Sequence, residues 1–175
     1  MRGRRLKFLS VSIGLVAWAV VLVLRMNPAT DLAALQASTP AREALVDPAP
    51  SPARLYASSC ASCHQGQGEG RFPVFPPLTG SPWVNGDADR LIALTLHGLS
   101  GPIEVNGVDY SGLMPGFAHL GDAEVAALLT HIRGGWGNGA AAVSAEDVAA
   151  VRTRTAHRRG PWTADELMAE GEDRP

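Results

Sequence analysis

Two cysteines and a histidine lie within one short stretch and could together hold a metal-containing group. The order is Cys60-Ala61-Ser62-Cys63-His64, and the chain has two cysteines in all. Residues three apart share a face of a helix, so both thiols are placed to add to the two vinyl groups of one porphyrin. The following imidazole lies where the porphyrin iron needs a proximal ligand. This is the pattern of covalent haem c attachment, and we predict one haem, bound through Cys60 and Cys63, with His64 on the iron.

Three other interpretations of the cysteine pair are a disulfide, a redox-active pair and half of a zinc site. A thioredoxin-like pair is expected within a βαβ unit and needs no histidine after it. A structural zinc site needs two further Cys or His ligands at matched spacing, and the sequence offers no such pair. Haem attachment is therefore the interpretation that the motif favours.

One of the four methionines is placed to be a second axial ligand. Met26 follows an apolar N-terminal stretch and Met168 lies in an acidic tail, whereas Met114 lies in a stretch with glycine and proline, residues 110–117. A methionine within a helix normally fills the core. A residue before proline, as Met114 is, is instead pushed toward an extended conformation. We expect a rigid loop that holds the Met114 thioether against the iron.

The N-terminus carries basic residues followed by an apolar stretch. Arg2, Arg4, Arg5 and Lys7 precede residues 8–24, which carry no charge. As a helix this stretch is about 25 Å long, at the short end of what spans a bilayer. The positive flank predicts a cytoplasmic N-terminus. A cleaved signal peptide is the competing interpretation, but its apolar region is usually shorter and ends at a small-x-small site.

These features predict four regions. Residues 1–25 are expected to be a transmembrane anchor or an uncleaved signal, which makes this a single-pass protein of the cytoplasmic membrane. Residues 26–50, rich in alanine and proline, are expected to form a semi-extended tether. Residues 51–137 are the predicted haem domain, on the periplasmic or extracytoplasmic side. Residues 138–175 are a predicted helical C-terminal extension.

The chain resembles class I c-type cytochromes, which have a CxxCH motif near the N-terminal end and a Met-Pro segment before the final helix. More narrowly, four stretches are similar to the cytochrome c domains and subunits of bacterial periplasmic quinoprotein alcohol dehydrogenases: Phe75-Pro76-Pro77-Leu78, Gly80-Ser81-Pro82-Trp83-Val84, His97-Gly98-Leu99 and Leu113-Met114-Pro115. The general resemblance covers about residues 50–137. It implies an all-α class I fold around one covalently bound haem.

The resemblance also implies roles for two further residues. Pro76 matches the proline whose carbonyl accepts a hydrogen bond from the proximal imidazole, here His64, and such a bond orients the ligand and makes it more electron-rich. Trp83 matches the region that meets the haem propionates, and its indole N–H is a suitable donor. Plain core packing is the other interpretation of Trp83. His131 departs from the family, because a tyrosine is common at its place on the last helix.

Helical spacing and capping signals predict the elements. In the haem domain we expect helices over residues 52–63, 87–97 and 121–133. In the extension we expect helices over 144–159 and 163–170, which could wrap the haem domain, dock a partner or form a solvated tail. The remaining histidines are expected to be capping, core or surface residues. His119 alone is close enough along the chain to replace Met114 if the loop rearranged.

An iron with His and Met on its two faces has no open position, so its chemistry reduces to gaining and losing one electron. We expect an electron carrier and no enzyme, with a dehydrogenase or quinol-oxidising complex as donor and a terminal oxidase or reductase as acceptor. One alternative is a haem subunit fixed in a larger oxidoreductase. Another is a haem sensor or peroxidase from which Met114 dissociates.

The charge of the chain bears on its partners. The net charge is −2, so nucleic acid is not expected as a partner. Residues 49–137 hold four arginines and seven carboxylates, a net charge of −3, and the one lysine of the chain is Lys7. A lysine ring that docks on acidic oxidases is therefore not available. We expect membrane tethering to supply the encounter with redox partners instead.

Overall fold

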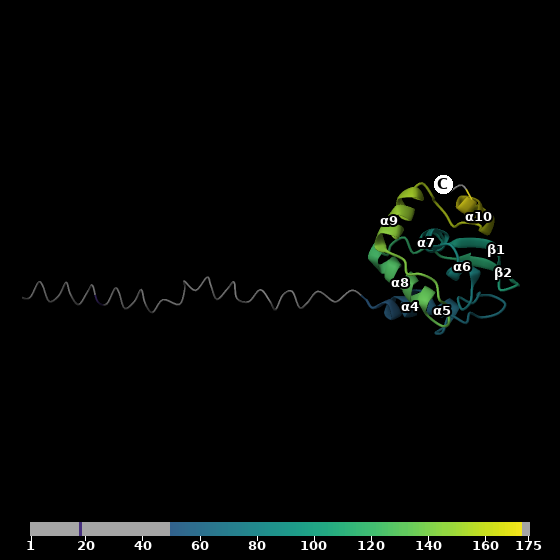
Figure 1. Cartoon of the computed structure of the whole chain (residues 1–175), viewed down its shortest axis with the longest axis horizontal. Coiled ribbons are helices and arrows are strands. Elements are labelled where there is room, and N and C mark those ends of the chain that lie inside the picture. Colours follow the sequence, from purple (N-terminus) through teal and green to yellow (C-terminus); the bar gives the residue numbers. More distant parts are fainter. Residues whose placement is uncertain (1–17, 19–49, 173–175) are drawn as a thin grey trace, which may run out of the picture. The chain divides into compact units, whose positions relative to one another are not determined.

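Seven helices and one two-stranded antiparallel sheet form the part of the chain that the structure describes, residues 18 and 50–172 (Figure 1). The structure is a computed structural model. Contacts between residues group Ala49–Pro175 into one compact unit, distinct from Met1–Pro48. The elements named below all belong to this unit.

The first two helices carry the CxxCH motif. Helix α4 spans Pro52–Ser59, and the Ser51 hydroxyl accepts a hydrogen bond from the Arg54 N–H (3.4 Å) at its start. The helix predicted over 52–63 is interrupted at Cys60, whose φ is −119°, and α5 spans Ala61–His64. The His64 N–H still bonds to the Cys60 carbonyl (2.9 Å). Both cysteines and the histidine therefore stay on adjacent turns.

Three further helices build the core of the haem domain. These are the short α6 (Pro82–Asn85), α7 (Ala88–His97) and α8 (Asp122–Gly134), and α8 packs against both α4 and α6. The fully buried large side chains of α7 and α8 are Ile92, Leu96, Val125, Leu128 and Leu129. Burial of each such side chain contributes about 1.5–3 kcal/mol. Of these side chains, Leu128 and Leu129 also line the cavity described below.

A β-hairpin takes the place of the predicted Met-bearing loop. Strand β1 (Leu99–Val105) pairs antiparallel with β2 (Val108–Met114), and Leu99 lies opposite Met114. Asn106 and Gly107 connect the strands with φ values of 55° and 77°. An Asn-Gly pair favours this two-residue turn because both residues tolerate positive φ. Residues 110–114 are therefore strand, and only the part from Pro115 onward is irregular.

The predicted fold class, all-α with an N-terminal transmembrane helix and a helical C-terminal tail, is not that of the structure. The hairpin adds a sheet to the helices. Among the residues that the structure describes, no helix is both long and apolar enough to cross a bilayer. The predicted anchor (1–25) and tether (26–50) lie outside the described residues, apart from Trp18 and Pro50.

The C-terminal extension packs on the haem domain. Helix α9 (Ala145–Arg154) packs against α8 and α7, and α10 (Ala164–Glu172) packs against α7 and β1 (Figure 1). Val148, Val151, Trp162 and Leu167 are buried in the same apolar core as the haem domain. Of the three arrangements left open by the sequence, the described part of the extension thus takes the first and wraps the domain. Helix α9 ends earlier than predicted, at Arg154.

Candidate haem site

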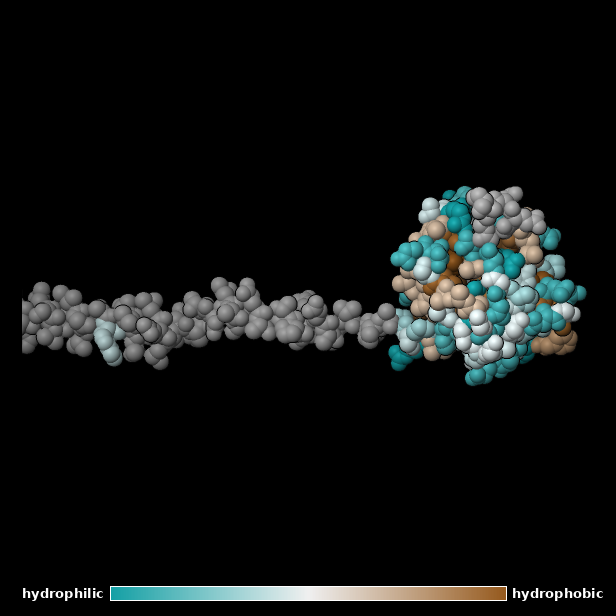
Figure 2. All heavy atoms as spheres, viewed as in Figure 1, coloured by the Kyte–Doolittle hydropathy of each residue, from teal (hydrophilic) through white to brown (hydrophobic). Residues whose placement is uncertain are grey.

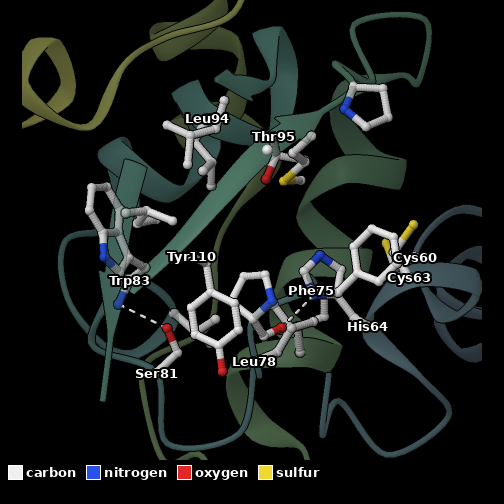
Figure 3. A pocket seen from close by; sticks show the side chains of 18 of the residues that line it. Cys60, Cys63, His64, Phe75, Leu78, Ser81, Trp83, Leu94, Thr95 and Tyr110 are labelled. Atoms are coloured by element: carbon white, nitrogen blue, oxygen red, sulfur yellow. Dashed lines mark hydrogen bonds between the residues drawn. The ribbon is translucent and has the colours of Figure 1, made fainter. Parts of the chain in front are cut away.

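A cavity of about 440 Å³ lies between the helices and the hairpin. All six residues predicted for the site line it: Cys60, Cys63, His64, Pro76, Trp83 and Met114. Figure 3 shows Cys60, Cys63 and His64 together at one side of the view and Trp83 at the other. Much of the wall between them is apolar, including Leu78, Val84, Leu94, Leu128 and Ile132. The structure therefore brings together residues that span more than fifty positions of the sequence.

Both thiols at the cavity are unpaired. Cys60 is buried, Cys63 is half-buried, and neither forms a disulfide. Burial, and secondarily the neighbouring Cys63, raises the pKa of the Cys60 thiol to about 11. Cys60 is therefore a protonated thiol at neutral pH, packed in the core beside the cavity. A free metal ion binds the thiolate, so the protonated form of Cys60 is a poor ligand for such an ion.

The imidazole of His64 is held in one tautomer by a backbone carbonyl. Its Nδ1 lies 2.9 Å from the carbonyl oxygen of Pro76 (Figure 3). Because a carbonyl only accepts, Nδ1 carries the proton and Nε2 keeps its lone pair. Burial lowers the pKa of His64, and the bond to Pro76 partly opposes that shift. A neutral imidazole with a free Nε2 is the form that ligates iron.

A tight loop between α5 and α6 brings the Pro76 carbonyl to His64. The Gly70 N–H bonds to the His64 carbonyl (3.0 Å), and the Leu78 N–H bonds to the Gly68 carbonyl (2.7 Å). Gly70 has φ +68°, and a Cβ there would lie 2.5 Å from the Phe75 carbonyl oxygen. Glycine is thus required at this position both for its backbone conformation and for lack of space.

Met114 is the last residue of β2 and is half-buried against the core. Its backbone is fixed by the end of α7: a Cβ on Gly98, which has φ +86°, would lie only 2.3 Å from the Met114 carbonyl oxygen. A Cβ on Gly116 would in turn lie 2.7 Å from the Leu96 carbonyl oxygen. The two chain segments therefore interlock, and this close packing fixes where the Met114 side chain starts.

Trp83 lines the cavity, but its indole N–H already has a partner. Nε1 donates to the backbone carbonyl of Glu104 in β1 at 3.0 Å, and the Arg90 guanidinium lies 4.8 Å from the ring centroid. The indole thus ties α6 to the hairpin. The propionate contact implied by the family resemblance would have to share or replace this bond, and it remains a prediction.

Tyr110 and Thr95 also line the cavity and were missed by sequence reasoning. Tyr110 is a buried residue of β2, opposite Ile103 in the sheet. Thr95 is buried on α7, and its hydroxyl donates its hydrogen to the Leu91 carbonyl (2.7 Å). That hydrogen is therefore not available to a ligand in the cavity. The Asn106-Gly107 turn was the available signal for Tyr110, because it predicts a strand there rather than a loop.

The other histidines differ in their distance from the cavity. His119 is exposed and lines it. His97 is bound elsewhere, with Nε2 2.8 Å from the Thr155 hydroxyl, and its pKa is lowered by burial and, less strongly, by Arg158, Arg152 and His157. His131 packs against the rings of Tyr56 and Trp136, with centroids 6.1 and 5.7 Å away. Of these three, only His119 is positioned as an alternative ligand.

The donor set and the cavity fit a haem. A cofactor site is typically a mostly apolar cavity of about 300–1,000 Å³ with a few placed polar groups. Here two thiols, an imidazole with a free Nε2 and a thioether open onto one such cavity. Soft thioether and imidazole donors on an enclosed apolar site suit haem iron. Among the described residues, no cluster of three His, Cys, Asp or Glu side chains could hold another metal.

Comparison with known proteins agrees with this site. Residues 47–132 match the family described as cytochrome c oxidase, cbb3-type, subunit III. Cytochrome c-552 of Thermus thermophilus is 41% identical over 111 residues, which cover 58% of this chain and 84% of that protein. The cytochrome c subunits of the quinone-dependent alcohol dehydrogenase of Gluconobacter oxydans and the gluconate 2-dehydrogenase of Pantoea cypripedii are each 39% identical, over 58% and 57% of this chain but only 22% and 23% of those subunits. The chain belongs to the cytochrome c family of electron-transfer proteins, and the family implies haem c.

Proposed function

We propose that this chain is a single-haem electron carrier and not itself an enzyme. The observation that carries the proposal is that Cys60, Cys63, His64 and Met114 all open onto one apolar cavity. When bound there, haem supplies reversible one-electron chemistry at its iron. Cys60 and Cys63 would hold it covalently through thioether bonds, and His64 and Met114 would supply the ligands of its iron.

The residues around the site determine which oxidation state is favoured. His64 binds through Nε2 and is oriented by Pro76. Met114 supplies a soft, neutral thioether, which raises the reduction potential. The apolar walls act in the same direction, because burial disfavours the extra charge of the oxidised state. A haem held by both His64 and Met114 would leave no position for a substrate, so the chain would only pass electrons.

We place the carrier on the outer side of the cytoplasmic membrane, held there by its N-terminal segment. The four basic residues among positions 2–7, followed by the uncharged residues 8–24, support this position. The chain would take electrons from a dehydrogenase or quinol-oxidising complex and pass them to a terminal oxidase or reductase. Washing isolated membranes with alkaline carbonate tests the location: the cytochrome stays in the pellet if it is held in the membrane and is released if it is not.

A second candidate is a cytochrome subunit fixed within a larger oxidoreductase. It is favoured by the likeness to chains named as cytochrome c subunits of alcohol and gluconate dehydrogenases. Purification under mild detergent distinguishes the two. If a catalytic subunit stays in fixed ratio with the cytochrome through size-exclusion chromatography, the chain is a fixed subunit of an oxidoreductase. If the cytochrome elutes alone, it is a free electron carrier.

Optical spectra of the full-length protein test the site itself. Oxidised, reduced and reduced carbon monoxide-treated samples are compared. The proposal expects a low-spin c-type spectrum, a sulfur-to-iron charge-transfer band in the oxidised state, no change with carbon monoxide, and one haem per chain. Loss of the band together with a carbon monoxide shift would mean an open iron, and a haem sensor or peroxidase would become the better assignment.

A further inference from the structure

We propose that Arg152 of the C-terminal extension is a positioning residue for the Met114 ligand. The proposal rests on the function above, in which Met114 binds the iron. Arg152 lies on α9, outside the segment that matches the family profile. It reaches the irregular stretch, residues 115–121, that follows Met114 and leads into α8.

Arg152 makes three hydrogen bonds at the far end of this stretch. Its Nη1 donates to the Ala118 carbonyl at 2.9 Å, and its Nη2 donates to the Leu120 carbonyl at 2.8 Å. Its Nε donates to Oδ1 of Asp122, the first residue of α8, at 2.7 Å. The planar guanidinium suits three acceptors at once. Bonds from a charged donor are stronger than bonds between neutral groups.

The stretch has few regular backbone bonds of its own. The Phe117 N–H bonds to the Thr95 carbonyl (2.9 Å) and the Leu120 N–H bonds to the Phe117 carbonyl (3.0 Å). Gly116 packs on the end of α7, as described above. The end of the stretch next to Met114 is therefore held by α7, and the end next to α8 is held by Arg152. Met114 directly precedes this stretch.

A second attachment from the extension secures the segment that Met114 packs on. The Trp162 N–H donates to the Gly98 carbonyl (3.0 Å), and the Ser100 N–H donates to the Trp162 carbonyl (2.7 Å). Gly98 is the residue against which the Met114 backbone is packed. The extension thus bonds to the chain on both sides of the hairpin that ends in Met114.

This arrangement implies that Arg152 sets how often Met114 leaves the iron. An external ligand binds only to molecules in which Met114 is displaced, so its apparent affinity reports the displaced fraction. Arg152→Ala removes both bonds to the stretch and the one to Asp122. Loss of one charge-assisted hydrogen bond is enough to change such an equilibrium about tenfold.

Arg154 provides a matched control. It lies two residues away on α9 and pairs with Asp89 of α7 at 2.7 Å, and no bond to residues 115–121 is seen for it. His119 needs a second control, because it lies between the two carbonyls that Arg152 holds and lines the cavity. A freed stretch could bring its imidazole to the iron and hide the displacement of Met114. Each variant is therefore also made with His119→Ala.

The test titrates imidazole into the full-length oxidised haem protein and follows the charge-transfer band, with thermal unfolding by circular dichroism as a measure of overall stability. We expect Arg152→Ala, with His119→Ala, to bind imidazole about tenfold more tightly than His119→Ala alone. Arg154→Ala, with His119→Ala, should bind imidazole with the same affinity as His119→Ala alone, whatever its melting temperature. Arg152→Lys keeps the charge but loses the fork, and it should give a smaller rise; it serves as the test if Arg152→Ala does not fold.

Two results would overturn the inference. One is an imidazole affinity for the Arg152 variants equal to that of the parent. The other is an equal rise for Arg154→Ala, which would trace the effect to general destabilisation. Both differ from failure of the proposed function itself, in which the unmodified protein already lacks the charge-transfer band.

Discussion

The side chains that line the cavity reach it in two ways, because some are neighbours along the chain and others meet only when the chain folds. Cys60, Cys63 and His64 are local to one motif, and their chemistry follows from spacing alone. Met114 required a comparison among four methionines, and its position before proline singled it out. Tyr110 and Thr95 line the same cavity but are ordinary residues of a strand and a helix. The Asn106-Gly107 turn indicates the strand that carries Tyr110, but whether either side chain faces the cavity depends on tertiary packing.

Replacing the predicted ligand gives the most direct test at this scale. Met114→Ala removes the thioether and leaves an apolar methyl at the cavity. We expect the charge-transfer band to vanish, the reduction potential to fall, and the reduced protein to bind carbon monoxide. Met168→Ala is the matched control, since Met168 is 51% exposed on α10. An unchanged spectrum in Met114→Ala would remove Met114 from the site.

Gly98, which packs against the Met114 backbone, allows the effect of backbone strain to be separated from that of steric overlap. Gly98 has φ +86°, and the Cβ added by Gly98→Ala would lie 2.3 Å from the Met114 carbonyl oxygen. Gly137 has a similar φ of +83°, but the Cβ added by Gly137→Ala would have no neighbouring atom within 4 Å. Strain at positive φ costs about 1–3 kcal/mol in both. We expect Gly98→Ala to lower the free energy of unfolding more than Gly137→Ala, and to weaken the charge-transfer band. Equal losses in denaturant titrations would show that the overlap relaxes without cost.

Among the elements, helices were easier to predict than strands. The cap of α9 was readable, since Ser144 and Asp147 form a capping box. The hairpin was not predicted, because the glycine and proline residues within 110–117 favour a loop over a strand. Asn106-Gly107, the residues at its turn, indicate two paired strands of opposite direction.

The docking of the extension could not be derived from its own sequence. The spacing of Val148 and Val151 predicts an apolar face, which suits packing on this chain and docking to another equally well. The complementary surface on α7 and α8 decides between them. That surface forms only when segments far apart in the sequence meet.

Helix α10 carries a pH-sensitive cap. Glu166 accepts bonds from Arg158 (3.0 and 2.7 Å) and from the Thr163 N–H (2.8 Å). These bonds, that with Arg158 foremost, hold the pKa of Glu166 at about 2, below its ordinary 4.5. Because the pKa of Glu166 is lower in the folded than in the unfolded protein, its bonds contribute their full stability above a pH of about 4.5. This contribution is lost as the pH falls from about 4.5 through about 2.

Glu166→Gln should therefore reduce the acid sensitivity of α10. We expect the wild type to gain susceptibility to pepsin within the extension as the pH falls from about 4.5 to 2. In Glu166→Gln the extension should already be more susceptible at pH 5 and change less on acidification. Glu170→Gln, on the same helix, is the control. A Glu166→Gln profile that follows the wild type at every pH would show that the cap does not hold α10.

At the scale of the whole molecule, the surface sets how partners are met. In the view of Figure 2 hydrophilic and hydrophobic areas are interspersed over the described domain. Two of its most exposed large apolar side chains, Val74 and Leu113, also line the cavity. The mouth of the site therefore presents apolar contacts to a partner, which suits brief encounters that depend little on charge.

This surface leads to a prediction about salt. Residues 49–137 carry a net charge of −3 and no lysine, so long-range steering toward an acidic partner is absent. Screening shortens the Debye length from about 30 Å at 0.01 M to about 8 Å at 0.15 M salt. We expect the rate of electron transfer to a membrane oxidase, measured by stopped flow, to change less than about threefold over this range, whereas steered association falls steeply. Glu69→Lys with Glu104→Lys, both exposed, is the positive control, because it creates basic charge on the domain. A steep salt dependence of the unmodified protein would show that charge, and not apolar contact or confinement at the membrane, governs the encounter.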